Sequence, residues 1–126
     1  MMWPTLPVRA NDTDKSRMGR VLVIAGSRGM AGAAVLCAEA ALRTGRGYVY
    51  VATVGAIAPE WTAAVPTAIL RCTNDREQAQ LTNVDLAMLI DASSNVDAVV
   101  VGPGLSDGVE LWLGESVEVA HCFCQC

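Results

Sequence analysis

The sequence predicts an α/β fold in which a mostly parallel sheet is covered by helices. Residues 20–25, 26–32, 33–44 and 48–53 follow one another as a strand, a glycine-rich loop, a helix and a second strand, which is one complete βαβ unit. A further aliphatic strand at 97–101 also ends in a glycine turn. The composition agrees, because 52% hydrophobic residues with eleven glycines and only 17% charged residues suit a sheet buried on both faces.

Each part of the βαβ unit has a local cause. The run Val21-Leu22-Val23-Ile24 is continuously aliphatic, which is typical of a parallel strand covered on both sides. The helix that follows consists of strong helix formers, and its many alanines allow close packing on the sheet. Gly45 stands where a C-cap glycine is expected. Apart from Ala52, the residues from Tyr48 to Thr53 are β-branched or aromatic and predict the second strand.

The middle of the chain carries weaker patterns. Pro59 suits the first turn of a short helix that reaches Val65. Residues 68–72 predict a short third strand. Residues 76–92 are helix-like, with a break expected near Thr82-Asn83.

Length and charge narrow the function classes. The chain has 126 residues, enough for one domain, and a net charge of -4, which gives no general attraction to nucleic acid or anionic lipid. The start lacks a basic segment followed by an apolar one, so we predict no signal peptide. No apolar run approaches the roughly eighteen residues of a membrane span. We therefore expect a cytoplasmic protein, and its five cysteines, an odd number, do not predict a disulfide framework.

The two glycine turns are the candidate binding site. Ligands of open parallel sheets bind beyond the carboxyl ends of the strands, where both turns must lie. Glycines there let backbone N–H groups approach a ligand, and the N-terminus of the following helix favours a phosphate. The candidate residues are Gly26, Ser27, Gly29, Met30, Gly32 and Ala33 in the first turn, and Gly102 and Gly104 in the second. The alternative is that these glycines serve only tight turns and close packing.

Other ligand motifs fit less well. A dinucleotide-binding Rossmann motif calls for an acidic residue at the end of the second strand, where this chain has Thr53 and Val54. A P-loop calls for lysine and a hydroxyl residue after the last glycine, where Ala33 and Ala34 stand. A catalytic pair of Ser27 with the only histidine, His121, is disfavoured, and we assign no catalytic residue.

Residues 15–34, KSRMGRVLVIAGSRGMAGAA, closely resemble the opening motif of the NAD(P)H-hydrate dehydratase family. The resemblance continues through AALRTGRG at 40–47 and returns with DAVVVGPGL at 97–105. It implies a ribokinase-like three-layer α/β/α fold, incomplete at its C-terminal end. It also implies repair of hydrated nicotinamide cofactors, in which ATP or ADP, with Mg²⁺, phosphorylates NAD(P)H hydrate and loss of phosphate regenerates the reduced ring. On that basis the two turns bind the dinucleotide, with Ala33 and Gly104 foremost.

The chain also departs from the family pattern. It has Asp14-Lys15-Ser16 where the family often has His-Lys-Gly, and Ser106 where a glycine usually closes the second turn. The family's later segments, which include the Gly-Thr-Gly-Asp helix start with the catalytic aspartate, are absent. We therefore divide the chain into a partial domain at 1–106 and an atypical tail at 107–126. The tail ends in Cys122-Phe123-Cys124-Gln125-Cys126, which suggests a shifted reading frame rather than a metal site.

The resulting hypothesis is a truncated repair enzyme with part of a dinucleotide site and negligible activity by itself. The alternative is a non-catalytic nucleotide-binding or assembly module. An incomplete parallel sheet exposes a strand edge, so we expect aggregation or assembly with further copies as a homo-oligomer.

Overall fold

The computed structural model describes residues 5, 8, 11–12, 14–105 and 121–123. They form one sheet of five strands in the order β3-β2-β1-β4-β5, and every neighbouring pair is parallel. The strands are β1 Arg20–Ile24, β2 Tyr48–Thr53, β3 Ile69–Cys72, β4 Ala98–Val101 and β5 His121–Phe123. The predicted α/β fold with a parallel sheet is confirmed.

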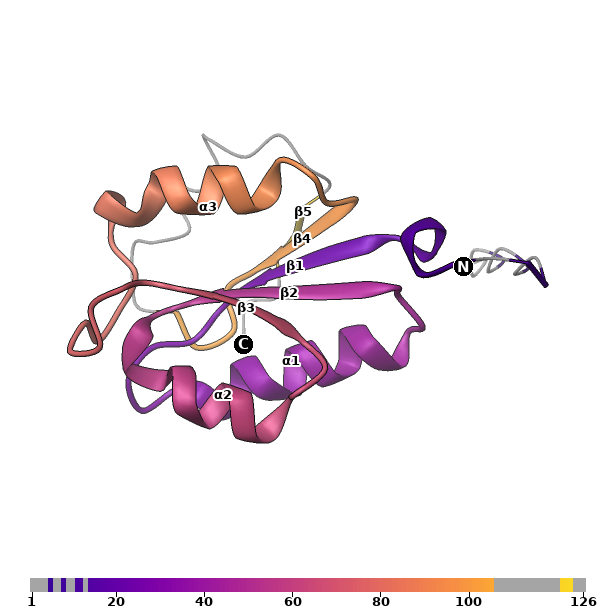
Figure 1. Ribbon diagram of the computed structural model, residues 1–126. Coiled ribbons are helices and arrows are strands. Elements are labelled where there is room, and N and C mark those ends of the chain that lie inside the picture. Colours follow the sequence, from indigo (N-terminus) through magenta and orange to yellow (C-terminus); the bar gives the residue numbers. More distant parts are fainter. Residues whose placement is uncertain (1–4, 6–7, 9–10, 13, 106–120, 124–126) are drawn as a thin grey trace.

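Helices cover both faces of the sheet and give three layers (Figure 1). Helices α1, Ala31–Arg43, and α2, Ala58–Ala64, lie on one face, and α3, Leu86–Ser93, lies on the other. Short 3-10 helices precede β1, α2 and α3 at Lys15–Met18 (η1), Gly55–Ile57 (η2) and Asn83–Asp85 (η3). None of the described helices is both long enough and apolar enough to span a bilayer.

The core lies on both sides of β1. Leu22, Val23 and Ile24 are completely buried between the two helical layers, which is why this strand needs an unbroken aliphatic run. Burying side chains of this kind stabilises the fold by about 2 kcal/mol each. Helix α1 buries the small residues Ala34 and Ala38 against the sheet, and this brings its backbone close to the strands.

The predicted middle helix is only partly correct. Residues 76–82 are not helical, and the helix begins only after Thr82. There Thr82 and Asp85 form a reciprocal capping box, in which the side chain of each accepts from the backbone N–H of the other. The expected break at Thr82-Asn83 is thus the helix start.

The remaining elements agree with their predicted ranges to within two residues, and helix α1 begins at Ala31, so that Gly32 of the predicted loop lies in its first turn. One strand was not predicted. Strand β5 pairs with β4 in register, Val101 opposite Phe123, and lies in the segment that sequence analysis assigned to an atypical tail. Residues 106–120 and 124–126, including Cys124 and Cys126 of the expected shifted frame, lie outside the described residues.

The amino ends of the central strands are closed by the segment before β1. The backbone of η1 lies against Gly47, where an added Cβ would overlap the carbonyl group of Lys15. The Asp97 carboxylate accepts a 2.6 Å bond from the backbone N–H of Arg20, and the Asp97 N–H donates to the Arg20 carbonyl at 2.8 Å. The space at the amino ends of these strands is therefore occupied by the chain's own backbone.

Candidate functional site

The two glycine turns meet at the carboxyl ends of β1 and β4, which are neighbours in the sheet. The N–H of Gly26 donates to the Pro103 carbonyl at 2.8 Å, and the Ser27 hydroxyl donates to the Gly104 carbonyl at 2.8 Å. The turns predicted from two distant parts of the sequence are therefore interlocked.

Two of the glycines are explained by their neighbours and by their backbone conformation. A Cβ at Gly104 would lie 2.5 Å from the Met30 carbonyl oxygen, and its φ of +69° also favours glycine. Gly26 has a φ of +86°, which favours glycine, and a Cβ there would lie 2.7 Å from Ile57 Cδ1 and 3.0 Å from the Thr53 hydroxyl. At these positions the packing explanation of the glycines is sufficient.

The other two glycines of the first turn face open space. Among the described residues, no neighbour lies within 4 Å of a Cβ built at Gly29 or at Gly32. Gly29 has a φ of +83°, whereas Gly32 is an ordinary helical residue in the first turn of α1. Neither its backbone conformation nor its neighbours explain a glycine at position 32. Room for a ligand beside the backbone would explain it.

The start of α1 is open to an anion. Its N-cap residue, Met30, makes no side-chain capping hydrogen bond, and the first turn carries no acidic residue. The first N–H groups of a helix lack partners within the helix, and they carry the positive end of its dipole. Gly32 and Ala33 are exposed at this point. A phosphate group would find donors there without any rearrangement.

A strap formed by residues 73–82, which connects β3 to α3, crosses beside the first glycine turn. The Arg28 N–H donates to the Ala79 carbonyl at 2.7 Å. The Arg28 guanidinium also contacts the Glu77 carbonyl at 3.3 Å and the Glu77 carboxylate at 3.4 Å. Arg28 therefore joins the strap to the turn through both its backbone and its side chain.

Both ends of the strap are anchored independently of Arg28. At one end the Thr73 hydroxyl accepts from the Gly55 N–H at 2.9 Å. At the other, the Asp85 carboxylate accepts from the Thr82 N–H at 2.8 Å and from the Gln78 amide at 2.6 Å. The strap is thus held at the carboxyl ends of the strands by hydrogen bonds at both of its ends.

The structure brings together the residues predicted for the first turn and Gly104, while Gly102 connects β4 to the second turn with a φ of +131°. Sequence analysis missed Arg28 and the strap. An arginine between the loop glycines is a signal that could have pointed to Arg28. The strap depends on contacts between residues about fifty positions apart, and no local pattern predicts it.

The other side chains considered for catalysis or metal binding do not form a site among the described residues. The Ser27 hydroxyl is engaged with Gly104, and the Asp97 carboxylate is bound at the opposite end of the strands. Within the described residues, no group of three or more His, Cys, Asp or Glu side chains could hold a metal ion. A hollow of about 340 Å³ at the carboxyl end of β3 is lined partly by Cys72, Thr73 and Arg76, and its lining includes neither glycine turn.

Comparison with known proteins identifies relatives of this chain. The family model described as NAD(P)H-hydrate dehydratase matches residues 21–123. An ADP-dependent (S)-NAD(P)H-hydrate dehydratase from Xanthomonas campestris is 38% identical over 100 residues, which are 79% of this chain and 34% of that protein. A bifunctional NAD(P)H-hydrate repair enzyme, Nnr, from Coxiella burnetii is 40% identical over 121 residues, which are 93% of this chain and 22% of that protein.

Solved structures similar to this chain come from the same family and from the ribokinase-like superfamily. The ADP/ATP-dependent NAD(P)H-hydrate dehydratase from Bacillus subtilis, co-crystallised with ATP and Mg²⁺, superposes with a TM-score of 0.69 at 25% identity. The match covers 94% of this chain and 41% of that one. A ribokinase-like superfamily protein from Enterococcus faecalis gives the same TM-score and identity, covering 86% of this chain and 36% of that one. The chain thus spans about a third or less of the length of the two curated relatives, and the ribokinase-like fold predicted from the sequence is confirmed.

Proposed function

Because this chain belongs to the NAD(P)H-hydrate dehydratase family, we propose that its interlocked glycine turns bind the dinucleotide of NAD(P)H hydrate. The ligand lies against Gly29, Gly32, Ala33 and Gly104, with a phosphate at the first turn of α1. The turns that bind the ligand are shaped by Gly26, Ser27, Met30 and Gly102.

One observation carries this proposal. Gly32 lies at the start of a thirteen-residue helix, in a regular conformation, and no described residue comes within 4 Å of the place where its side chain would begin. In an isolated fold such a position favours alanine over glycine by up to about 1 kcal/mol. A ligand that needs the backbone bare at this point offsets that cost.

The reaction we propose for the whole enzyme is the ADP- or ATP-dependent dehydration of NAD(P)H hydrate. The nucleotide phosphorylates the hydrate, and departure of the phosphate restores the reduced nicotinamide ring. The described residues of this chain bind and orient the dinucleotide, and we assign none of them to proton transfer. Since no described cluster of acidic, His or Cys side chains fits a metal ion, we derive no step through Mg²⁺ and assign it no ligand here.

Calorimetric titration of the purified chain tests the binding. We expect hydrated NADH and hydrated NADPH to bind, and AMP, which lacks the pyrophosphate bridge and the second nucleoside, to bind more weakly. If AMP binds and the dinucleotides bind no better, the chain is a general nucleotide-binding module and the proposal is wrong.

An assay with hydrated NADH, ATP and Mg²⁺ tests whether this chain binds the dinucleotide without catalysing the reaction. We expect the absorbance of the reduced ring not to recover beyond the rate without protein. Recovery at an enzymatic rate would show that this chain supplies the chemical step as well.

A further inference from the structure

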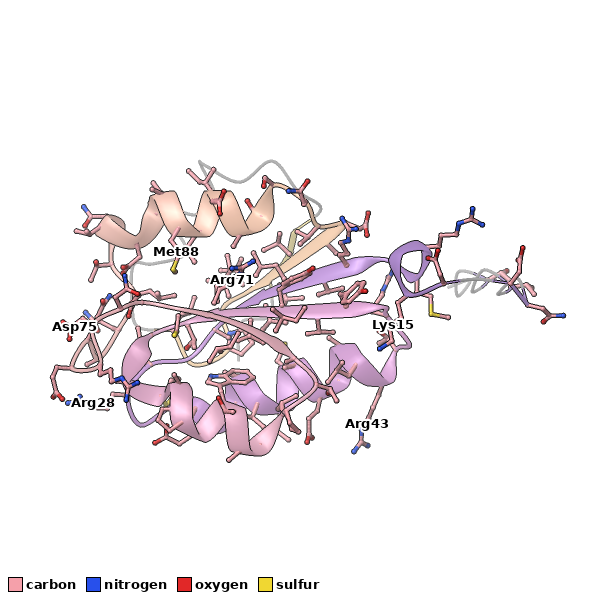
Figure 2. All side chains as sticks on the ribbon, viewed as in Figure 1. Lys15, Arg28, Arg43, Arg71, Asp75 and Met88 are labelled. Carbon is pink, nitrogen blue, oxygen red and sulfur yellow. The ribbon has the colours of Figure 1, made fainter. Side chains whose placement is uncertain are left out.

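Arg28 is the only charged residue of the first glycine turn, residues 26–32. It directly precedes Gly29, and no described residue lies within 4 Å of a Cβ built there. Figure 2 places its side chain at the carboxyl-end edge of the sheet, the same end as Asp75 of the strap. A guanidinium group at this point suits a phosphate, because its planar array of donors matches two phosphate oxygens.

In the described structure this guanidinium faces the carboxylate of Glu77. The contact is 3.4 Å long, and the two side chains are 55% and 89% exposed. Exposed ion pairs of this kind contribute little to stability, because water screens them and two long side chains must be ordered. The pair is thus weak enough to be exchanged for another anion.

The ion pair is also unnecessary for holding the strap. The backbone bond from Arg28 to Ala79 and the anchors at Thr73 and Asp85 remain when either side chain of the pair is replaced. A role in fastening the strap therefore does not account for a charged pair at this position.

We infer that Arg28 is a ligand-binding residue for the pyrophosphate group of the dinucleotide and that Glu77 is an internal competitor for it. When the ligand binds, the guanidinium leaves the Glu77 carboxylate for phosphate oxygens, while the strap stays docked through its backbone. This rests on the proposed dinucleotide site and adds to it a specific cation and a carboxylate that lowers the affinity.

Neutral variants of the two partners distinguish this role from a structural clasp. If the pair were a clasp, Arg28→Gln and Glu77→Gln would break the same contact and both would weaken binding. If the carboxylate competes, the two changes act in opposite directions. We expect Arg28→Gln to weaken binding of hydrated NADPH about fivefold and Glu77→Gln to strengthen it about twofold to threefold, as suits solvent-screened charges.

The test is calorimetric titration of the full chain with hydrated NADPH and, separately, with inorganic pyrophosphate. Arg28→Lys should keep part of the affinity, since it retains the charge and loses the planar fork. Two controls carry the same charge changes elsewhere: Arg43→Gln at the far end of α1, where Figure 2 shows the side chain, and Asp91→Asn on α3. Both controls should bind like the wild type.

The outcomes separate the two proposals. If the wild type binds and both variants weaken binding, or neither changes it, the inference is wrong and the dinucleotide site stands. The inference also fails if Arg43→Gln weakens binding as much as Arg28→Gln. If the wild type binds neither hydrated NADPH nor pyrophosphate, the site and the inference fall together. Urea unfolding of each variant should match the wild type, and if Arg28→Gln is unfolded, the gain expected for Glu77→Gln still decides.

Discussion

The two ends of the sheet use glycine for opposite purposes. At the amino ends of the strands, Gly47 leaves room for the chain's own backbone, the carbonyl group of Lys15. At the carboxyl ends, Gly32 leaves room that nothing in the described structure fills. Gly104 is intermediate, since it packs against Met30 and is still partly exposed. The comparison teaches that a glycine becomes evidence for a ligand only when the fold itself gives no reason for it.

The largest effect on stability is expected at the amino ends of the strands, where Gly47 packs against the Lys15 backbone. Gly47→Ala places a methyl group on the Lys15 carbonyl, so η1 must move away from the start of β2. We expect the free energy of unfolding to fall by about 3 kcal/mol, at the upper end of what overpacking costs. Urea unfolding measures this, and a midpoint equal to that of the wild type would contradict the close contact.

A smaller effect is expected where the two turns interlock. Gly104→Ala adds a methyl group near the Met30 carbonyl and forces a side chain into a left-handed conformation, for a cost of about 2 kcal/mol. Because Gly26 donates to Pro103 in the adjacent turn, its amide should also exchange faster with solvent. Unchanged exchange at Gly26 alongside lower stability would mean that the turns are not coupled.

Much of this arrangement could be predicted from the sequence, because the relevant signals are local. The aliphatic run before Gly26 and the one before Gly102 each define a strand and its turn, and parallel strands bring their carboxyl ends to one edge. These local signals could not predict which glycines have neighbouring atoms in the space where a side chain would lie. The neighbour of Gly47 is Lys15, and that of Gly104 is Met30, so the outcome depends on contacts between distant residues.

The strap is a second feature that local sequence signals could not predict. Residues 76–82 contain enough helix formers to predict a helix, yet Asp75 turns the chain by accepting the Glu77 N–H at 2.8 Å, and Arg28 holds Ala79. Tertiary contacts override a weak propensity here. The Thr82 to Asp85 spacing is a local signal that could have located the true helix start.

The smallest effect on stability and the most direct test of the site are expected at Gly32. In Gly32→Leu the new side chain meets no described residue and leucine is a better helix former than glycine, so the free energy of unfolding should not fall and should rise by up to about 1 kcal/mol. Ala40→Leu, at an exposed position farther along α1, is the matched control.

The decisive measurement is the affinity of these two variants for hydrated NADPH, determined together with their urea unfolding. We predict that Gly32→Leu loses at least about tenfold in affinity while being at least as stable as the wild type, and that Ala40→Leu loses none, because a leucine side chain at position 32 would occupy the space of the bound phosphate. Full affinity in a folded Gly32→Leu variant would contradict the claim that the bare backbone at the start of α1 receives the dinucleotide.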